Sequence, residues 1–388
     1  MRQLANMSRG ARWAVPAGTV VLAGGVMAGS MISVAQAAPP LPARTPAQLL
    51  AAAAGTTSVP PMTGTVVETV SLGLPSLPET GNPASLSSLL TGSHTIRIWY
   101  SDPAHYRLAA IESMSESDLV RNGSSAWLWE SAKNTVTRIA IPARAAKQAP
   151  EHASGAPLTP QQAASQILAK VGPTTMVSVD SNVNVAGEDS YQLVLAPKSS
   201  GSLIGQVRIA LDGRRNVPLR VQVFAKGAKS PAIQIGFTSV SFVKPAAANF
   251  TSRPPAGAKV TQDSLGSGHA GRSGKDSTGG PTMIGKGWLA VADLPSSVLS
   301  SATASTPAGS SGGSALGGST NAVIGALLRS ATRVSGPWGS GRLLRTSLVS
   351  LLITDNGRVL AGPVTPRVLY QAAAQAAQPQ HAPTPKAK

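Results

Sequence analysis

Two stretches, Leu219-Arg220-Val221-Gln222-Val223 and Ile233-Gln234-Ile235-Gly236-Phe237-Thr238, decide how this chain folds. In each stretch, apolar side chains alternate with polar or small ones. A period of two puts alternate side chains on opposite faces of a β-strand, so one face is dry and the other is wet. The two stretches therefore predict neighbouring antiparallel strands that share one apolar face.

The same alternation recurs more loosely between residues 65 and 243. It is found at residues 207–211, 191–195 and 95–100. Many such strands in succession predict an antiparallel sheet with a continuous apolar face. The function of the protein then depends on what covers that face: helices, a second sheet, a partner or an apolar ligand.

Two helices are expected beside this sheet. Thr45-Pro46 and Thr159-Pro160 each supply a capping residue and a suitable first helical residue. They predict helices over residues 45–55 and 159–171. Helices of two to three turns can cover only part of a broad sheet.

The N-terminus is typical of an export signal. Three arginines within the first twelve residues precede an apolar run at residues 20–27, and Ala35-Gln36-Ala37 is a cleavage site of the A-x-A kind. We expect residues 1–37 to be a signal peptide and the mature protein to be exported. If the signal is not cleaved, residues 13–35 would anchor the chain in the membrane.

Composition divides the rest of the chain. Residues 38–256 hold the strands and helices above, and the Gly- and Ser-rich residues 257–281 are expected to form a flexible linker. Residues 282–372 predict a small C-terminal domain with a low-complexity insertion, and residues 373–388 a disordered tail. Within that domain, strands are expected at residues 288–291, 347–354 and 358–364, a hairpin turn at Asp355-Asn356-Gly357, and helices at residues 322–329 and 365–370.

Motifs that carry chemistry lack the context they need. The chain has no cysteine, which excludes disulfides and thiolate metal sites. The histidines are scattered over predicted loops and linkers, without metal-ligand spacing. Matches to nucleotide-binding and hydrolase motifs at residues 266–271 and 309–313 lack flanking strands and helices. The densest acidic cluster, Glu112, Glu116 and Asp118, is expected to be a solvated strand edge. We therefore expect no enzyme, no cofactor and no metal.

The formal net charge is +17. No dense basic run is present, so a nucleic-acid partner is not expected. For an exported chain, this charge favours anionic lipid head groups or acidic wall polymers as partners.

Several motifs resemble a known family. Residues 191–198 are similar to the L-T-P-K strand end of the LolA family of periplasmic lipoprotein carriers, and residues 121–129 to its D-G-x-x-x-W-x-Y strand. Residues 249–260 resemble its closing F-x-x-x-P-P-x-G-V. Residues 357–366 and the predicted helix after them resemble the end of the RseB/MucB sigma-factor regulators. That family pairs a LolA-like large domain with a small domain that binds an anti-sigma factor.

These resemblances imply an α+β fold. It would be a curved antiparallel half-barrel sheet with covering helices, whose apolar face holds acyl chains, plus a small C-terminal α+β unit. They imply a lipid- or lipoprotein-binding protein with a sensing or regulatory role and no catalysis. The alternatives are a lipoprotein carrier, or an interaction protein that docks a membrane anti-sigma partner. Asp102 precedes Pro103 where carriers tend to have Arg, which argues against lipoprotein hand-off.

The expected lining of the apolar face consists of apolar side chains from the alternating strands. Trp127 and Trp129 share one face of their strand, and core packing is the alternative to ligand lining for both. The candidates are Ile96, Ile98, Tyr100, Trp127, Trp129, Leu193, Leu195, Val221, Val223, Ile233, Ile235 and Phe237.

Overall fold

The computed structural model describes residues 41–55, 59–74, 91–112, 115–141, 159–264, 282–296, 327 and 329–377. The expected signal peptide with its cleavage site, the alternative anchor at residues 13–35 and the two glycine-rich motif matches lie outside these residues. So does most of the helix expected at residues 322–329. In the described part of the chain, no helix has the length and apolar character needed to cross a membrane.

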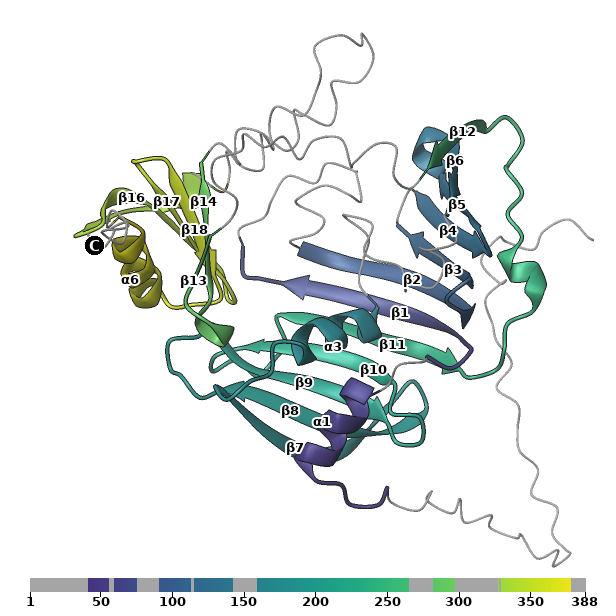
Figure 1. Ribbon diagram of the computed structural model, residues 1–388, viewed down its shortest axis with the longest axis horizontal. Helices are drawn as coiled ribbons and strands as arrows, with labels where there is room; N and C mark the ends of the chain where they lie inside the picture. The colour runs from purple at the N-terminus through teal and green to yellow at the C-terminus, as the bar shows by residue number, and fades with distance from the viewer. Residues whose placement is uncertain are drawn as a thin grey trace, which may run out of the picture. The chain divides into compact units, whose positions relative to one another are not determined.

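A large curved sheet dominates the described residues (Figure 1). Its strands are β1 Met62–Ser71, β2 Thr91–Asp102, β3 His105–Ile111, β4 Glu116–Asn122, β5 Ser125–Glu130, β6 Thr135–Ala140, β7 Thr175–Val185, β8 Glu188–Pro197, β9 Ile204–Asp212, β10 Pro218–Ala225, β11 Ile233–Ser241 and β12 Lys259–Ser264. The order across the sheet is β12-β6-β5-β4-β3-β2-β1-β11-β10-β9-β8-β7. All neighbours are antiparallel except β12 and β6, which are parallel. The expected curved antiparallel sheet is confirmed.

Two helices cover one face of strands β7 to β11 (Figure 1). Helix α1, Pro46–Gly55, packs on β7 and β8, and helix α3, Pro160–Leu168, packs on β10 and β11. Both were predicted from their caps. At α3, Gln162 N donates to Thr159 Oγ1 at 3.3 Å and Thr159 N donates to Gln162 Oε1 at 2.9 Å, which forms a capping box.

The core of the large sheet lies between these helices and the strands. Leu49 of α1 and Ala164 of α3 are fully buried, in one cluster with Leu193 of β8 and Ile209 of β9. The small side chain at Ala164 lets α3 lie close to the sheet. The alternating strands thus bury their apolar members under the two helices, as the period of two requires.

The C-terminal domain contains a second sheet. Its strands are β13 Thr282–Ile284, β14 Val291–Pro295, β15 Thr332–Gly336, β16 Gly339–Arg345, β17 Ser350–Thr354 and β18 Arg358–Gly362, in the order β13-β14-β18-β17-β16-β15. Helix α6, Pro366–Ala377, packs on this sheet, and its Leu369 is fully buried with Leu352 and Leu360. The expected turn between β17 and β18 is present, and Gly357 adopts φ +84° there.

Three local predictions for the C-terminal half were wrong, and two strands were missed. Residues 259–264, expected in the linker, form β12, and α6 continues to Ala377 because Ala372 and Ala373 of its apolar face are buried. The strand expected at residues 288–291 is a 3-10 turn, Gly287–Leu289, followed by β14. Strands β15 and β16 were not predicted, because glycines and serines around their turn weaken the alternation.

Candidate functional site

Strand register shows which predicted site residues share a face. Leu193 lies opposite Ile209, Ile209 opposite Val221, and Val221 opposite Ile235. Residues directly opposite each other on neighbouring strands point to the same side of a sheet. We call this side, which α1 and α3 cover, the helix-side face. Following the register through β11, β1 and β2 assigns ten candidates to it: Ile96, Ile98, Tyr100, Leu193, Leu195, Val221, Val223, Ile233, Ile235 and Phe237.

Most of these ten side chains are already covered by the protein itself. Leu193 and Leu195 are 0% exposed. Ile96, Ile98, Val221, Ile235 and Phe237 are buried in the same cluster as the helix residues, whereas Tyr100, Val223 and Ile233 are partly buried. Their role in ligand binding stays a prediction.

The two tryptophans do not share this face. Trp127 lies opposite Val120, Val120 opposite Arg107, and Arg107 opposite Trp99, whose side chain points away from that of the adjacent Ile98. Trp129, two residues further along β5, points to the same side of the sheet as Trp127. Both tryptophans therefore lie on the other side of the sheet, which we call the far face. Alternation shows which residues of one strand share a face, but it does not relate the faces of strands several positions apart.

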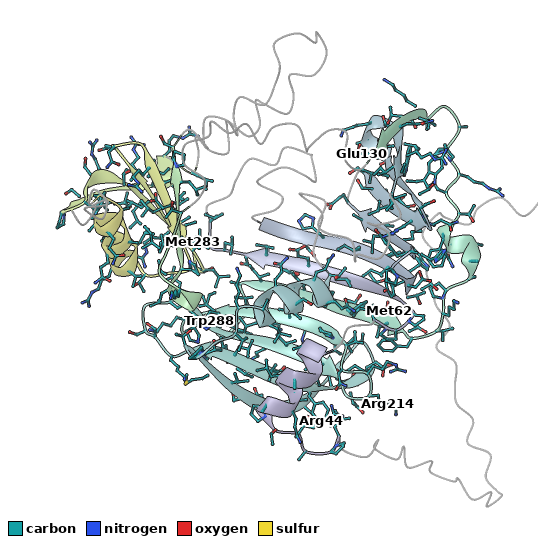
Figure 2. All side chains as sticks on the ribbon, viewed as in Figure 1. Arg44, Met62, Glu130, Arg214, Met283 and Trp288 are labelled. Atoms are coloured by element: carbon teal, nitrogen blue, oxygen red, sulfur yellow. The ribbon has the colours of Figure 1, made fainter. Side chains whose placement is uncertain are left out.

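An apolar cavity of about 330 Å³ lies between the helix-side face, α3 and the C-terminal domain. Val207 and Val223 contribute from the strands and Ile167 from α3. Met283 and Trp288, both labelled in Figure 2, contribute from the start of the C-terminal domain. Of the candidates, Val223 is the one that lines this cavity. The sequence pattern does not reveal the other walls, because α3, the strands and the two parts of the C-terminal domain that line the cavity are more than thirty residues apart along the chain.

Polar contacts fix the walls of this cavity. Trp288 Nε1 donates to Thr175 Oγ1 at 2.8 Å. Leu203 N donates to Pro363 O at 2.9 Å, and Thr365 N donates to Gly201 O at 2.8 Å. A side chain at Gly201 would come within 2.8 Å of Val368, so the close approach requires glycine. The C-terminal domain is thus held on the large sheet by backbone hydrogen bonds and by the side chain of Trp288.

Lys170 is the charged side chain among the described residues that line the cavity. It follows the C-terminal end of α3 and is exposed to solvent. A lysine in this position can reach an anionic group at the mouth while its methylene stem lies along apolar surface. The arrangement suits a ligand with an apolar chain and a negatively charged end.

The acidic cluster is not a single solvated edge. Asp118 is buried on the far face, where its Oδ2 lies 2.6 Å from Arg107 Nη2. Glu112 Oε1 instead lies 2.9 Å from Nδ1 of the buried His94. Within the described residues, no group of three or more His, Asp or Glu could hold a metal ion.

Asp102, the residue that departs from the carrier pattern, lies in the turn between β2 and β3. Its Oδ1 is 2.9 Å from His105 Nδ1 and accepts a hydrogen bond from Ala104 N at 2.8 Å. Burial by itself would raise the pKa of Asp102, but the hydrogen bonds from His105 and Ala104 outweigh it and lower that pKa. The carboxylate therefore has a structural partner in the turn.

No protein-family model and no curated protein matches this chain. Solved structures are similar to it. One is MucB, at 14% identity over 85% of this chain and 96% of that chain, with a TM-score of 0.36. Another is a chain of the MucA/MucB complex of Pseudomonas aeruginosa, at 15% identity over 84% and 95%, with a TM-score of 0.37. A LolA superfamily protein from Nitrosomonas europaea matches at 9% identity over 54% and 99%, with a TM-score of 0.23.

These structures come from the two families that the sequence motifs resemble. Because every one of these TM-scores is below 0.5, we take the function from this chain's own residues.

Proposed function

We propose that the protein is exported and binds the acyl chain of a lipid, or of a lipid-modified protein, in the cavity beside α3. The role would be sensing or regulation without catalysis. The observation that carries this proposal is an apolar cavity on the helix-side face with Lys170 at its mouth. The motif resemblances in the sequence point to the same class of ligand.

The dimensions of the cavity support a single chain. Small-molecule pockets span about 300–1,000 Å³, and this cavity of about 330 Å³ is at the lower end. Each buried methylene contributes about 0.8 kcal/mol, so roughly eight of them contribute roughly 6 kcal/mol. A charge contact at the mouth would bring the total binding free energy close to the value that corresponds to micromolar affinity.

A second candidate function is docking of a membrane anti-sigma-type partner. It is favoured by the fact that seven of the ten helix-side candidates are buried by the protein's own core. A face closed in this way needs no ligand, and the C-terminal domain would then carry the interaction. Cross-linking in cells through residues 282–370 should capture one membrane protein if this function holds. Absence of such a partner, together with a bound lipoprotein, would favour carriage.

The acyl-chain proposal is tested first on protein purified from its native host. Lipid extraction and mass spectrometry should return an acylated molecule, and the lipid-free protein should bind a fluorescent fatty acid. Ala292→Trp, which fills the cavity from β14, should abolish that binding. Ala132→Trp, the same exchange at an exposed position of the 3-10 turn Ser131–Lys133, is the matched control. Wild-type protein that yields no lipid and binds no fatty acid would refute the proposal.

A further inference from the structure

The far face of the large sheet has a shallow cavity of its own. Its volume is about 360 Å³, and it lies across β11, β1 and β2. The register places four hydroxyl side chains, one guanidinium and one indole ring on this side of the sheet. They belong to Thr63, Thr65, Arg97, Trp99, Ser239 and Ser241.

A second far-face cavity lies over β3 to β6. Its volume is about 510 Å³, and its other wall is the segment that follows the 3-10 turn Ala247–Phe250. That turn packs on β3 and β4, which holds the segment above the sheet. The side chains that give this cavity its chemistry are those of Arg107, Glu116, Asp118, Trp129, Thr251 and Arg253.

The two cavities adjoin. Trp99 lines the first and Arg107 the second, and they lie opposite each other on β2 and β3. The Arg107 guanidinium carbon is 5.1 Å from the centroid of the Trp99 ring, which is a cation–π contact. On the same face, Arg138 stacks over Trp127 at 5.2 Å. We call these two cavities and the Arg138–Trp127 pair the far-face groove.

The far-face groove is positively charged. It has four arginines and two carboxylates, and Asp118 is bound by Arg107 in a two-pronged contact of 2.6 and 3.0 Å. Three of the arginines form no ion pair with any described residue, and all three are exposed: Arg97, Arg138 and Arg253. Their planar guanidinium groups suit carboxylates and phosphates, which accept two parallel hydrogen bonds.

We propose that the far-face groove binds an acidic polysaccharide. Indole rings offer flat apolar surfaces with a polar edge, on which a sugar ring can lie. The threonine and serine hydroxyls both donate and accept hydrogen bonds, as sugar hydroxyls do. The arginines recognise the acidic substituents. This site is separate from the acyl-chain cavity and does not depend on it.

The carboxylates distinguish this ligand from a nucleic acid. Glu116 and Asp118 can accept hydrogen bonds but, when ionised, cannot donate them. Sugar hydroxyls can donate to Glu116, whereas the backbone of single-stranded DNA has no hydrogen-bond donor. A ligand that carries both hydroxyl donors and anionic groups therefore fits the groove best. The anion itself could be a uronate or a sugar phosphate.

The full chain should be titrated with polygalacturonate and with phosphorylated dextran, and binding should be followed by tryptophan emission. Neutral dextran and single-stranded DNA are the comparison polymers. We expect at least one of the two acidic polymers to bind at least tenfold more tightly than dextran or DNA. The tighter of the two identifies the anion. Equal binding of dextran, or tighter binding of DNA, would overturn the proposal.

Variants localise the binding. Arg97→Gln should weaken it about tenfold, because a charged hydrogen bond to the polymer is lost. Arg214→Gln removes the same charge from an exposed turn after β9 (Figure 2) and should change affinity less than twofold. Trp99→Phe should weaken binding while the melting temperature stays within a few degrees. If Arg97→Gln and Arg214→Gln have equal effects, the binding is general charge attraction and the groove is not the site.

Discussion

Arg358 of β18 holds the carboxylate of Asp293 on the neighbouring strand β14 in a fork-shaped ion pair. Arg358 Nε donates to Asp293 Oδ1 at 3.1 Å and Nη2 donates to Oδ2. Asp293 is 4% exposed, so its carboxylate is shielded from water and has Arg358 as its hydrogen-bonded partner. Arg358 Nη1 also donates to Ala376 O near the end of α6. One side chain thus links two strands and the last helix.

Replacing Arg358 should therefore destabilise the C-terminal domain. Arg358→Met leaves a buried carboxylate without its partner, and we expect a loss of about 3 kcal/mol in the free energy of unfolding. Arg333→Met removes an exposed arginine, which lies 3.7 Å from Asp355, and should cost under about 1 kcal/mol. Urea unfolding measures both variants. Equal losses would show that the Arg358–Asp293 pair contributes no more to the free energy of unfolding than the exposed Arg333–Asp355 pair does.

Tyr191 fastens the segment before α1 to the large sheet. Its hydroxyl donates to Pro42 O at 2.7 Å, and the guanidinium of Arg44 lies 4.9 Å from its ring centroid (Figure 2). Tyr191→Phe should lower stability by about 1 kcal/mol and expose residues 41–45 to protease. Tyr100→Phe is the control, since no hydrogen bond of the Tyr100 hydroxyl is found among the described residues. Unchanged proteolysis of Tyr191→Phe would contradict the fastening role.

Acid should destabilise the turn between β2 and β3 through Asp102. Its folded-state pKa is lowered, so its contribution to stability is present above the unfolded pKa of about 3.9. That contribution is lost as the pH falls through the folded pKa. The melting temperature of the wild type should approach that of Asp102→Asn as the pH falls below about 4. Parallel curves for the two proteins over this range would rule out the linkage.

The sequence predicted the parts of the fold that local patterns determine. Alternation located β10 and β11, and the Thr159-Pro160 pair located the start of α3. The sequence could not predict β12, because this strand has no alternation of its own. It pairs in parallel with β6, which lies more than a hundred residues earlier in the chain. Three of its four described side chains are exposed, including Val260 at 50%.

The candidate site was predicted only in part, for the same reason. The face of Trp127 depends on the registers of β2, β3, β4 and β5 together, and one strand's pattern cannot supply them. The acyl-chain cavity needs Trp288 beside Ile167 and Val223, and no local signal relates these three residues. Tertiary contacts, which need the whole chain, determine both.

A substitution of Lys170 tests whether binding in the acyl-chain cavity depends on the anionic head of the ligand or on its apolar chain. If its ammonium pairs with the head of the ligand, Lys170→Gln should weaken binding of a long-chain fatty acid about two- to fivefold, the size of an exposed ion pair. The same variant should bind the matching fatty alcohol as the wild type does, because the apolar walls are unchanged. Lys229→Gln, at an exposed position in the turn after β10, is the matched control. Competition with a fluorescent fatty acid measures all three proteins. An equal loss for acid and alcohol would mean that Lys170 shapes the cavity instead of recognising the anion, and no loss for either would place the head group elsewhere.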